Sequence, residues 1–168
     1  LFERVHPCLV RKDSYIGNVN GVMNAVIVEG YPVGESILQG EGAGPGATSS
    51  ALMSDFFSIL RGNIKYPFGL PSNKTKLSKV YNFNNYINSL YIRIEVKDKP
   101  GVLSQITQLL AKRNISVERL IQIPNNKNKT ASIVIITHKS YEHDSQKCIK
   151  SISSNRNVLK KPVLIRLL

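Results

Sequence analysis

Hydrophobic residues in the second half of the chain follow two periods in turn, and this alternation predicts its fold. Residues 90–96 are apolar at every second position, which is the pattern of a half-buried strand. Residues 102–110 carry apolar side chains at helical spacing, which predicts an amphipathic helix. The remaining elements are expected in this order: strands at 115–123 and 131–137, a helix after Ser140, and a closing strand at 163–167. The order βαββαβ is the ferredoxin-like arrangement of an α+β domain.

The second helix of this domain has a recognisable start. Ser140 is a typical N-cap residue, and two acids, Glu142 and Asp144, follow in the first turn, where they complement the helix dipole. We expect the Ser140 side chain to cap this helix. The spacing also predicts an inward-facing apolar side made of Tyr141, Cys148, Ile149 and Ile152.

The first 61 residues predict a different and incomplete structure. Apolar runs at 5–10, 24–29 and 33–38 favour short strands. A glycine-rich loop at 40–46 then leads into a helix that is expected over residues 48–60. A few strands, a loop and one helix cannot close a hydrophobic core, so we expect this segment to complete the sheet of a larger domain.

Residues 62–88 separate these two parts. They contain four lysines and no acid, have several prolines and glycines, and show little periodicity. This composition predicts a basic linker or a loop laid over the surface. The chain is therefore predicted to have three parts, with boundaries at 1–61, 62–88 and 89–168.

Composition argues against several classes of protein. The hydrophobic fraction of 42% argues against wholesale disorder, and no apolar run is long enough for a membrane span. The opening residues have the pattern of a strand interior, so we expect no signal peptide, and no membrane partner is expected either. Cys8 and Cys148 lie far apart, which argues against a disulfide and favours a cytoplasmic location. The net charge of +12 is spread along the chain, so no nucleic-acid partner is expected.

The sequence shows no complete catalytic or metal site. His6 and Cys8 would share one face of a strand, but two ligands do not make a metal site. A catalytic site also needs an acid or base with orienting groups around it, and no spacing in the chain indicates one. We therefore expect no metal and no catalytic residue in this chain.

The glycine-rich loop at 40–46 is one candidate for an anion site, because backbone N–H groups at a helix N-terminus suit a phosphate or carboxylate. Pro45 stands where the dinucleotide fingerprint would need its third glycine, and the loop lacks the Gly-Lys-Ser/Thr ending of a Walker loop. A tight structural turn is the alternative, and the spacing leaves both open.

The turn before the first helix of the second half is a stronger candidate. Pro100 fixes the backbone at the helix start, and Gly101 allows a ligand to approach the backbone closely. The N–H groups of Gly101, Val102 and Leu103 are expected to be free first-turn donors for a carboxylate. Asp98 could accept a hydrogen bond from an ammonium group, so the turn suits a free amino acid. The alternative is an ordinary strand-to-helix turn with a surface acid.

With the βαββαβ order, this Asp-x-Pro-Gly-Val-Leu turn resembles the ACT domain, a regulatory amino-acid-binding module. The resemblance covers residues 89–168 and implies that ligands bind at the turn, between paired domains. It assigns the ammonium acceptor to Asp98 and the glycine to Gly101, and it implies that a neighbouring subunit contributes Asn114. Val96 stands where some serine-sensing relatives carry a histidine, which disfavours serine as the ligand.

The first part resembles the end of the catalytic region of the homoserine dehydrogenase family, at Val-Asn-Gly-Val-Met-Asn-Ala-Val (19–26), Val-Gly (33–34) and Gly-Ala-Gly (42–44). That family reduces aspartate semialdehyde to homoserine. The resemblance implies NADP or NAD as the cofactor of the full-length enzyme, with Gly44 close to it. The family's catalytic lysine and nucleotide fingerprint would lie upstream. We therefore expect this fragment to be inactive and to hold no cofactor by itself.

The resemblance implies a C-terminal fragment, with the tail of the catalytic domain at 1–61, a basic linker at 62–88 and an ACT regulatory domain at 89–168. The implied partners are further copies of the chain, through sheet and ACT pairing, and a small amino-acid effector. Threonine is the first candidate effector, since it is the end product of the family's pathway. A stand-alone amino-acid-binding ACT protein is the alternative, and the incomplete structure expected over 1–61 argues against it.

Overall fold

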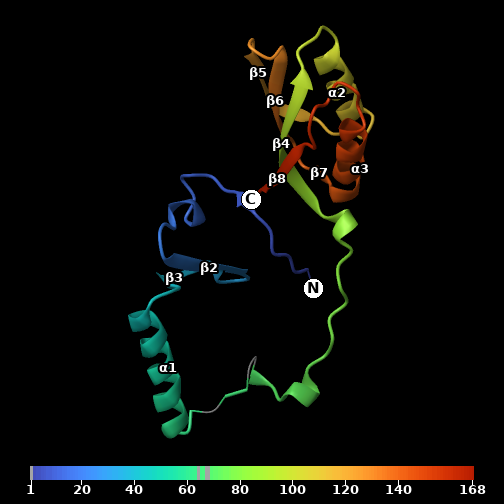
Figure 1. Cartoon of the computed structure of the whole chain (residues 1–168). Helices are drawn as coiled ribbons and strands as arrows, with labels where there is room; N and C mark the ends of the chain where they lie inside the picture. Colours follow the sequence, from blue (N-terminus) through green and yellow to red (C-terminus); the bar gives the residue numbers. More distant parts are fainter. Residues whose placement is uncertain (1, 64, 67–68) are drawn as a thin grey trace. The chain divides into compact units, whose positions relative to one another are not determined.

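The chain forms two compact units in a computed structural model that describes residues 2–63, 65–66 and 69–168. One unit contains residues 79–168 together with the first ten residues, and the other contains residues 11–78. Figure 1 shows the elements of both.

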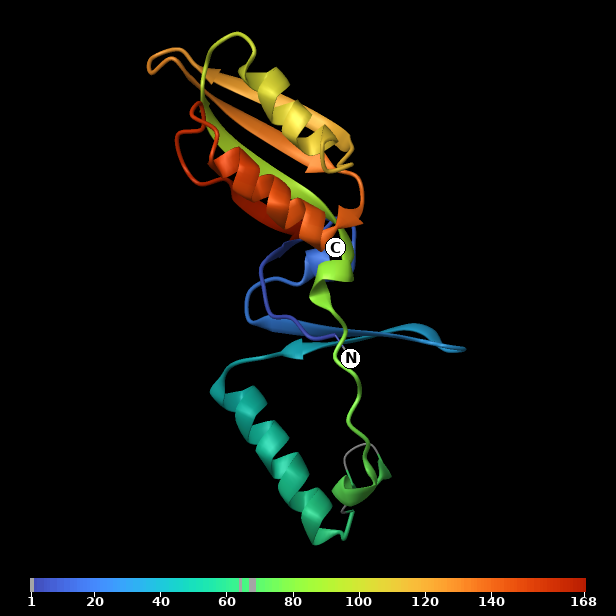
Figure 2. The same ribbon diagram turned by 90° about the vertical axis from the view of Figure 1, so that its right-hand side faces the viewer.

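The larger unit is a sheet with two helices on one face (Figure 2). Its strand order is β1-β8-β4-β6-β5. All neighbours are antiparallel except β1 and β8, which are parallel. The strands are β1 (Cys8–Leu9), β4 (Ile87–Lys97), β5 (Val117–Asn125), β6 (Thr130–Thr137) and β8 (Val163–Leu167), and the helices are α2 (Val102–Ala111) and α3 (Glu142–Ser153). The predicted order βαββαβ is confirmed by β4, α2, β5, β6, α3 and β8.

The core of this unit lies between the sheet and the helices. Alternate residues of β4 and β6 point into it, and α2 and α3 each contribute the apolar side of an amphipathic helix. The buried residues include Leu90, Ile92, Ile94, Val96, Val102, Ile106, Leu110, Ala131, Ile133, Ile135, Cys148 and Ile152. The hydrophobic alternation in the sequence therefore predicted the packing of this unit correctly.

The start of α3 differs from the prediction. Ser140 does not cap the helix, because its hydroxyl shares a hydrogen bond of 3.0 Å with the hydroxyl of Ser145. Residues 140–141 instead form a short strand, β7 (Ser140–Tyr141), which pairs with the beginning of β4. The helix consequently starts at Glu142 with Tyr141 as the N-cap residue, and the Tyr141 side chain, expected to face inward, is 49% exposed.

Residues 2–10 belong to the larger unit, and a short strand within them extends its sheet. Within the run 5–10, only Cys8–Leu9 forms a strand, and it pairs with the end of β8. Part of the predicted linker also belongs here: the 3-10 turn η4 (Phe83–Asn85) contacts α3. The N–H of Glu142 donates to the carbonyl of Tyr86 over 2.8 Å. The compact units therefore divide the chain differently from the three predicted segments.

The smaller unit consists of a hairpin and a helix. The strands β2 (Met23–Gly30) and β3 (Gly34–Glu41) are antiparallel, and α1 spans Pro45–Leu60. The helix starts three residues before the predicted position, because proline is well tolerated in the first helical turn. The described part of this unit also contains the 3-10 turns η1 (Ile16–Asn18) and η3 (Ser72–Lys74). Residues 64, 67 and 68 of the predicted linker lie outside the described part of the chain.

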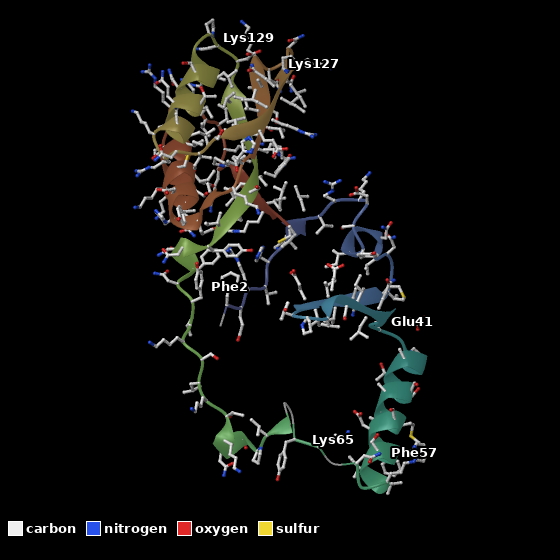
Figure 3. The ribbon with its side chains drawn as sticks, turned by 180° about the vertical axis from the view of Figure 1, so that it is seen from behind. Phe2, Glu41, Phe57, Lys65, Lys127 and Lys129 are labelled. Carbon is white, nitrogen blue, oxygen red and sulfur yellow. The ribbon has the colours of Figure 1, made fainter. Side chains whose placement is uncertain are left out.

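The smaller unit has little core of its own. Within the described part of the chain, α1 contains no buried residue, and large apolar side chains on the helix and hairpin remain exposed, as Figure 3 shows for Phe57. These include Val26, Val28, Leu38, Leu52, Phe56, Ile59 and Leu60. Uncovered apolar surface of this kind is typical of a region that packs against another domain or another copy.

We expect the chain to self-associate through this surface. Val26 and Leu38 face each other across the hairpin and are 58% and 69% exposed. Sedimentation velocity should show an average mass that rises with protein concentration. The double variant Val26→Lys and Leu38→Lys should shift the chain toward monomer, whereas Tyr31→Lys at the exposed hairpin turn should not. A concentration-independent monomer would contradict the expectation.

Candidate functional site

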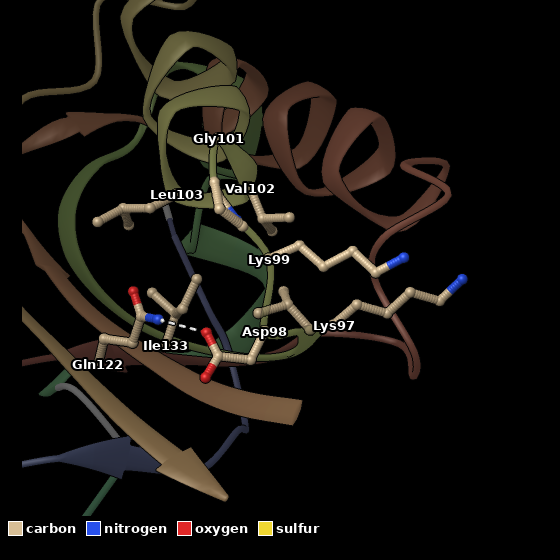
Figure 4. Close-up of a pocket in the computed structure, with 10 residues that line it drawn as sticks. Lys97, Asp98, Lys99, Gly101, Val102, Leu103, Gln122 and Ile133 are labelled. Atoms are coloured by element: carbon tan, nitrogen blue, oxygen red, sulfur yellow. Dashed lines mark hydrogen bonds between the residues drawn. The ribbon is translucent and has the colours of Figure 1, made fainter. Parts of the chain in front are cut away.

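A hollow of about 400 Å³ opens between the end of β4 and the start of α2. Its walls include the turn at residues 97–103, with Gln122 from β5 and Ile133 from β6 (Figure 4). The hollow lies at the turn selected from the sequence and brings together Asp98, Gly101, Val102 and Leu103. Gln122 has no counterpart among the predicted site residues.

Gly101 shapes the entrance to α2. It is the N-cap residue, and its φ of 83° lies in the left-handed region that favours glycine. A Cβ at this position would meet nothing within 4 Å, so the backbone is open on that side. The N–H of Val102 donates to the carbonyl of Lys99 over 3.3 Å, so the prediction of a free donor at Val102 is wrong. The N–H groups of Gly101 and Leu103 remain the candidate donors.

Asp98 supplies the negative charge of the hollow. Its carboxylate accepts a hydrogen bond of 3.3 Å from the Gln122 amide, and its own N–H donates to the carbonyl of Lys129 over 2.9 Å. Figure 4 shows the carboxylate turned toward Gln122, while the side chains of Lys97 and Lys99 extend away from that pair. The backbone bond fixes the turn, and the exposed carboxylate stays accessible to a cationic group.

The two other predicted site residues lie elsewhere. Asn114 lines a separate hollow of about 320 Å³ with Arg113, Tyr141 and Asp144, and its φ is 54°. Its predicted role depends on a neighbouring subunit, so that role stays a prediction. Gly44 belongs to the smaller unit, where it is the N-cap residue of α1 with a φ of 124°.

A metal site and a membrane span have no support in the described residues. No group of three or more His, Cys, Asp or Glu side chains there could hold a metal ion. His6 and Cys8 do meet, with 3.2 Å between the imidazole Nδ1 and the thiol Sγ, but they remain a pair. Among the same residues, no helix combines the length and the apolar character that a bilayer crossing needs.

Sequence reasoning missed the buried carboxylate of Glu142. The sequence placed this residue only in the first turn of the helix, as a complement to the helix dipole, but its side chain is fully buried. The carboxylate accepts hydrogen bonds from Asn88 (2.9 Å), from Gln146 (3.0 Å) and from both Nε and Nη2 of Arg166. Burial is the largest single influence on the Glu142 carboxyl, and by itself it would raise the pKa. The hydrogen bonds from Arg166, Gln146 and Asn88 together outweigh burial, so the pKa lies below its ordinary value.

The larger unit has the βαββαβ order of a ferredoxin-like domain with a hollow where its first strand meets its first helix, and residues 90–147 match the family model of the ACT domain. Residues 2–57 match the family model of homoserine dehydrogenase. The chain belongs to the homoserine dehydrogenase family, and it corresponds to the C-terminal part: the end of the homoserine dehydrogenase domain followed by an ACT domain.

Individual relatives agree with this assignment. The chain is similar to homoserine dehydrogenase of Neisseria gonorrhoeae, at 36% identity over 98% of this chain and 39% of that protein. It is 34% identical to the enzyme of the same name from Synechocystis, with the same coverage. A crystal structure of a homoserine dehydrogenase from Thiobacillus denitrificans matches with a TM-score of 0.85 and 29% identity, over 99% of this chain and 39% of that one. The chain thus spans about 39% of the length of these relatives.

Proposed function

We propose that this chain is the regulatory C-terminal part of a homoserine dehydrogenase and that its ACT domain binds a small amino acid as a feedback effector. The full-length enzyme would interconvert L-homoserine and L-aspartate 4-semialdehyde. The observation that carries the proposal is the hollow at residues 97–103, which combines an accessible carboxylate with a helix N-terminus.

The hollow suits both charged ends of an amino acid. The N-terminal end of α2 carries partial positive charge, and the N–H groups of Gly101 and Leu103 can donate to a carboxylate. Asp98 can accept a charge-assisted hydrogen bond from the ammonium group. Two opposite charges placed on one turn favour a zwitterion over a simple anion.

Threonine is the proposed effector. Gln122 donates its amide N–H to Asp98, so its side-chain oxygen can accept a hydrogen bond from a ligand hydroxyl. Leu103, a partly exposed residue of the hollow, supplies apolar surface for a methyl group. A hydroxyl and a methyl on one side chain are the features of threonine, and Asn114 of a neighbouring copy could close the site.

The cofactor of the full-length enzyme would be NADP or NAD, which takes up the hydride from homoserine. Gly44 fits a close approach by such a group, because its φ is 124° and a Cβ there would meet nothing within 4 Å. This chain would contribute only that contact. The catalytic lysine and the nucleotide-binding domain would belong to the rest of the enzyme.

Asp98→Ala should weaken threonine binding by roughly 10- to 100-fold, because a charge-assisted hydrogen bond is worth about 1.5–3 kcal/mol. Isothermal titration calorimetry of the variant and the wild type with threonine should measure this loss. Titrations of the wild type with serine, isoleucine, lysine and methionine should show which amino acid the site prefers. Glu118→Ala removes an exposed acid from β5 and should leave the affinity unchanged. Equal affinity of Asp98→Ala and wild type would mean that the site is misplaced.

The chain alone should give only background rates with homoserine and NAD⁺ or NADP⁺, because the proton-transfer and nucleotide-binding groups are proposed to lie outside it. The assay follows the absorbance of the reduced cofactor over time at increasing concentrations of the chain. Turnover on the order of 1 per second would contradict the proposed division of the enzyme.

The rival function is a stand-alone amino-acid-binding regulator. It would bind the same ligands, so calorimetry does not separate the two. The smaller unit favours the enzyme fragment, because its helix and hairpin expose apolar residues that a self-sufficient protein would cover.

A further inference from the structure

We propose that residues 2–10 form a releasable latch on the ACT domain and that effector binding and latch closure strengthen each other. Residues 2–57 match the homoserine dehydrogenase domain, yet the first ten residues pack into the unit that contains the ACT domain. The contact therefore joins the two family regions. The coupling to the effector rests on the proposed function, whereas the docking of the latch does not.

The latch is attached at the buried carboxylate of Glu142. Residues 79–168 of the larger unit, here called the ACT unit, include Asn88, Gln146 and Arg166, which supply the hydrogen bonds to this carboxylate. Arg4 of the latch approaches the same carboxylate, with 4.0 Å between Nη1 and Oε1, which is an ion pair without a hydrogen bond. The ACT unit therefore keeps Glu142 in place, and the latch adds a second, more weakly held cation.

Ring contacts complete the attachment. The Arg4 guanidinium lies over the Phe83 ring at 3.9 Å from its centroid. Phe2 stacks on Tyr86 with 4.7 Å between ring centroids and an interplanar angle of 13°, and it also stacks on Phe83 at 5.7 Å. Figure 3 shows Phe2 next to the segment that leads into β4. Phe2 is 37% exposed, so this surface can be released without opening the core.

Two features make the attachment of the latch less stable than the ACT unit to which it binds. Its strand β1 contributes only Cys8–Leu9 to the sheet. The Arg4 Nη1 atom is buried without a hydrogen-bond partner. A buried polar atom without a partner lowers the stability of the closed state. The latch can therefore open while the hydrogen bonds between Glu142 and the ACT unit remain.

The strand β4 connects the latch to the hollow. Asn88, which binds Glu142, stands at its beginning, and Asp98 follows its last residue. The ten residue steps from Asn88 to Asp98 span about 33 Å of rigid strand. A ligand that orders the turn at residues 98–103 therefore acts on the end of the same strand that carries the latch contact. By thermodynamic linkage, the factor by which the ligand shifts the latch equilibrium toward the closed state equals the factor by which latch closure raises ligand affinity.

Hydrogen exchange measured by mass spectrometry on the full chain tests both parts. The double variant Phe2→Ala and Arg4→Ala should speed exchange in the peptide that covers residues 2–10, while the peptides of β4 and β6 stay protected. Threonine affinity should fall by about 5-fold or more, the lower end of typical coupling. Saturating threonine should slow exchange of residues 2–10 in the wild type by the same factor.

Arg11→Ala is the matched control, since Arg11 is exposed and pairs with Asp13 rather than with Glu142. It should change neither exchange nor affinity. Unchanged exchange of residues 2–10 in the double variant would overturn the latch. If exchange of residues 2–10 becomes faster in the double variant while its threonine affinity stays the same, the coupling is overturned. If no amino acid binds the wild type, the proposed function fails and the coupling with it, but the exchange of the variants still decides whether residues 2–10 dock.

Discussion

Replacing Glu142 with glutamine is expected to lower the free energy of unfolding by about 3–5 kcal/mol, the usual effect of breaking a buried ion pair. The variant would leave the charge of Arg166, whose side chain is only 11% exposed, without a counter-charge. The midpoint of thermal unfolding should fall by roughly 6–20 °C for a chain of this size. Circular dichroism during heating, with urea unfolding beside it, measures both quantities.

Glu118→Gln is the control for this variant, because Glu118 is an exposed acid of β5 whose nearest cation, Arg119, is also exposed. Its effect should stay within about 0.5 kcal/mol. A loss below about 1 kcal/mol in Glu142→Gln would show that the cluster is not held by the carboxylate charge.

The same cluster should give a signature in pH. The pKa of Glu142 in the folded chain lies below its ordinary value of 4.5, so its contribution to stability is complete above pH 4.5 and is lost as the pH falls toward the folded pKa. Urea unfolding between pH 6 and pH 3 should show this acid-labile component in the wild type. Glu142→Gln should lack it, because glutamine does not titrate.

Gly101→Val is expected to abolish amino-acid binding at millimolar ligand, a loss of more than about 100-fold for a ligand that binds in the micromolar range. The φ of 83° disfavours any L-residue and especially a β-branched one. The new side chain would also occupy the open space beside the backbone where the ligand carboxylate is proposed to lie. Calorimetry with threonine measures the loss.

A control variant is needed to distinguish the effect of backbone strain in Gly101→Val from the loss of the binding site itself. Gly62 has a φ of 73° and equally open space, and it lies in the smaller unit. Gly62→Val should therefore carry similar strain without affecting threonine affinity. Circular dichroism of Gly101→Val should retain the signal of a folded α+β protein. Wild-type affinity in Gly101→Val would place the ligand elsewhere.

The ACT fold was predictable because its signals are local. Hydrophobic alternation in β4 and helical spacing in α2 each record burial on one side of an element, so periodicity alone gives their type and order. Local signals failed at the start of α3. There the pairing of Ser140 and Tyr141 with β4 decided against a side-chain cap, and that pairing joins residues far apart in the sequence.

The candidate site was predictable only in part, for the same reason. Asp98 and Gly101 lie within a few residues of each other, so the sequence of the turn alone indicated an amino-acid site, and both residues line the hollow. Gln122 reaches the hollow from another strand, and no spacing in the sequence relates it to Asp98. Glu142 could not be assigned either, because its partners Arg166 and Arg4 lie 24 and 138 positions away in the chain.

The most direct test of the central claim is an amide NMR titration of the ¹⁵N-labelled chain with threonine. We predict saturable shifts concentrated at residues 98–103 and at Gln122, with the N–H signals of Gly101 and Leu103 among the largest. Such a pattern would mean that the hollow at the start of α2 is the effector site. No shift at millimolar threonine, or shifts centred on the separate hollow beside Asn114 and Tyr141, would contradict it.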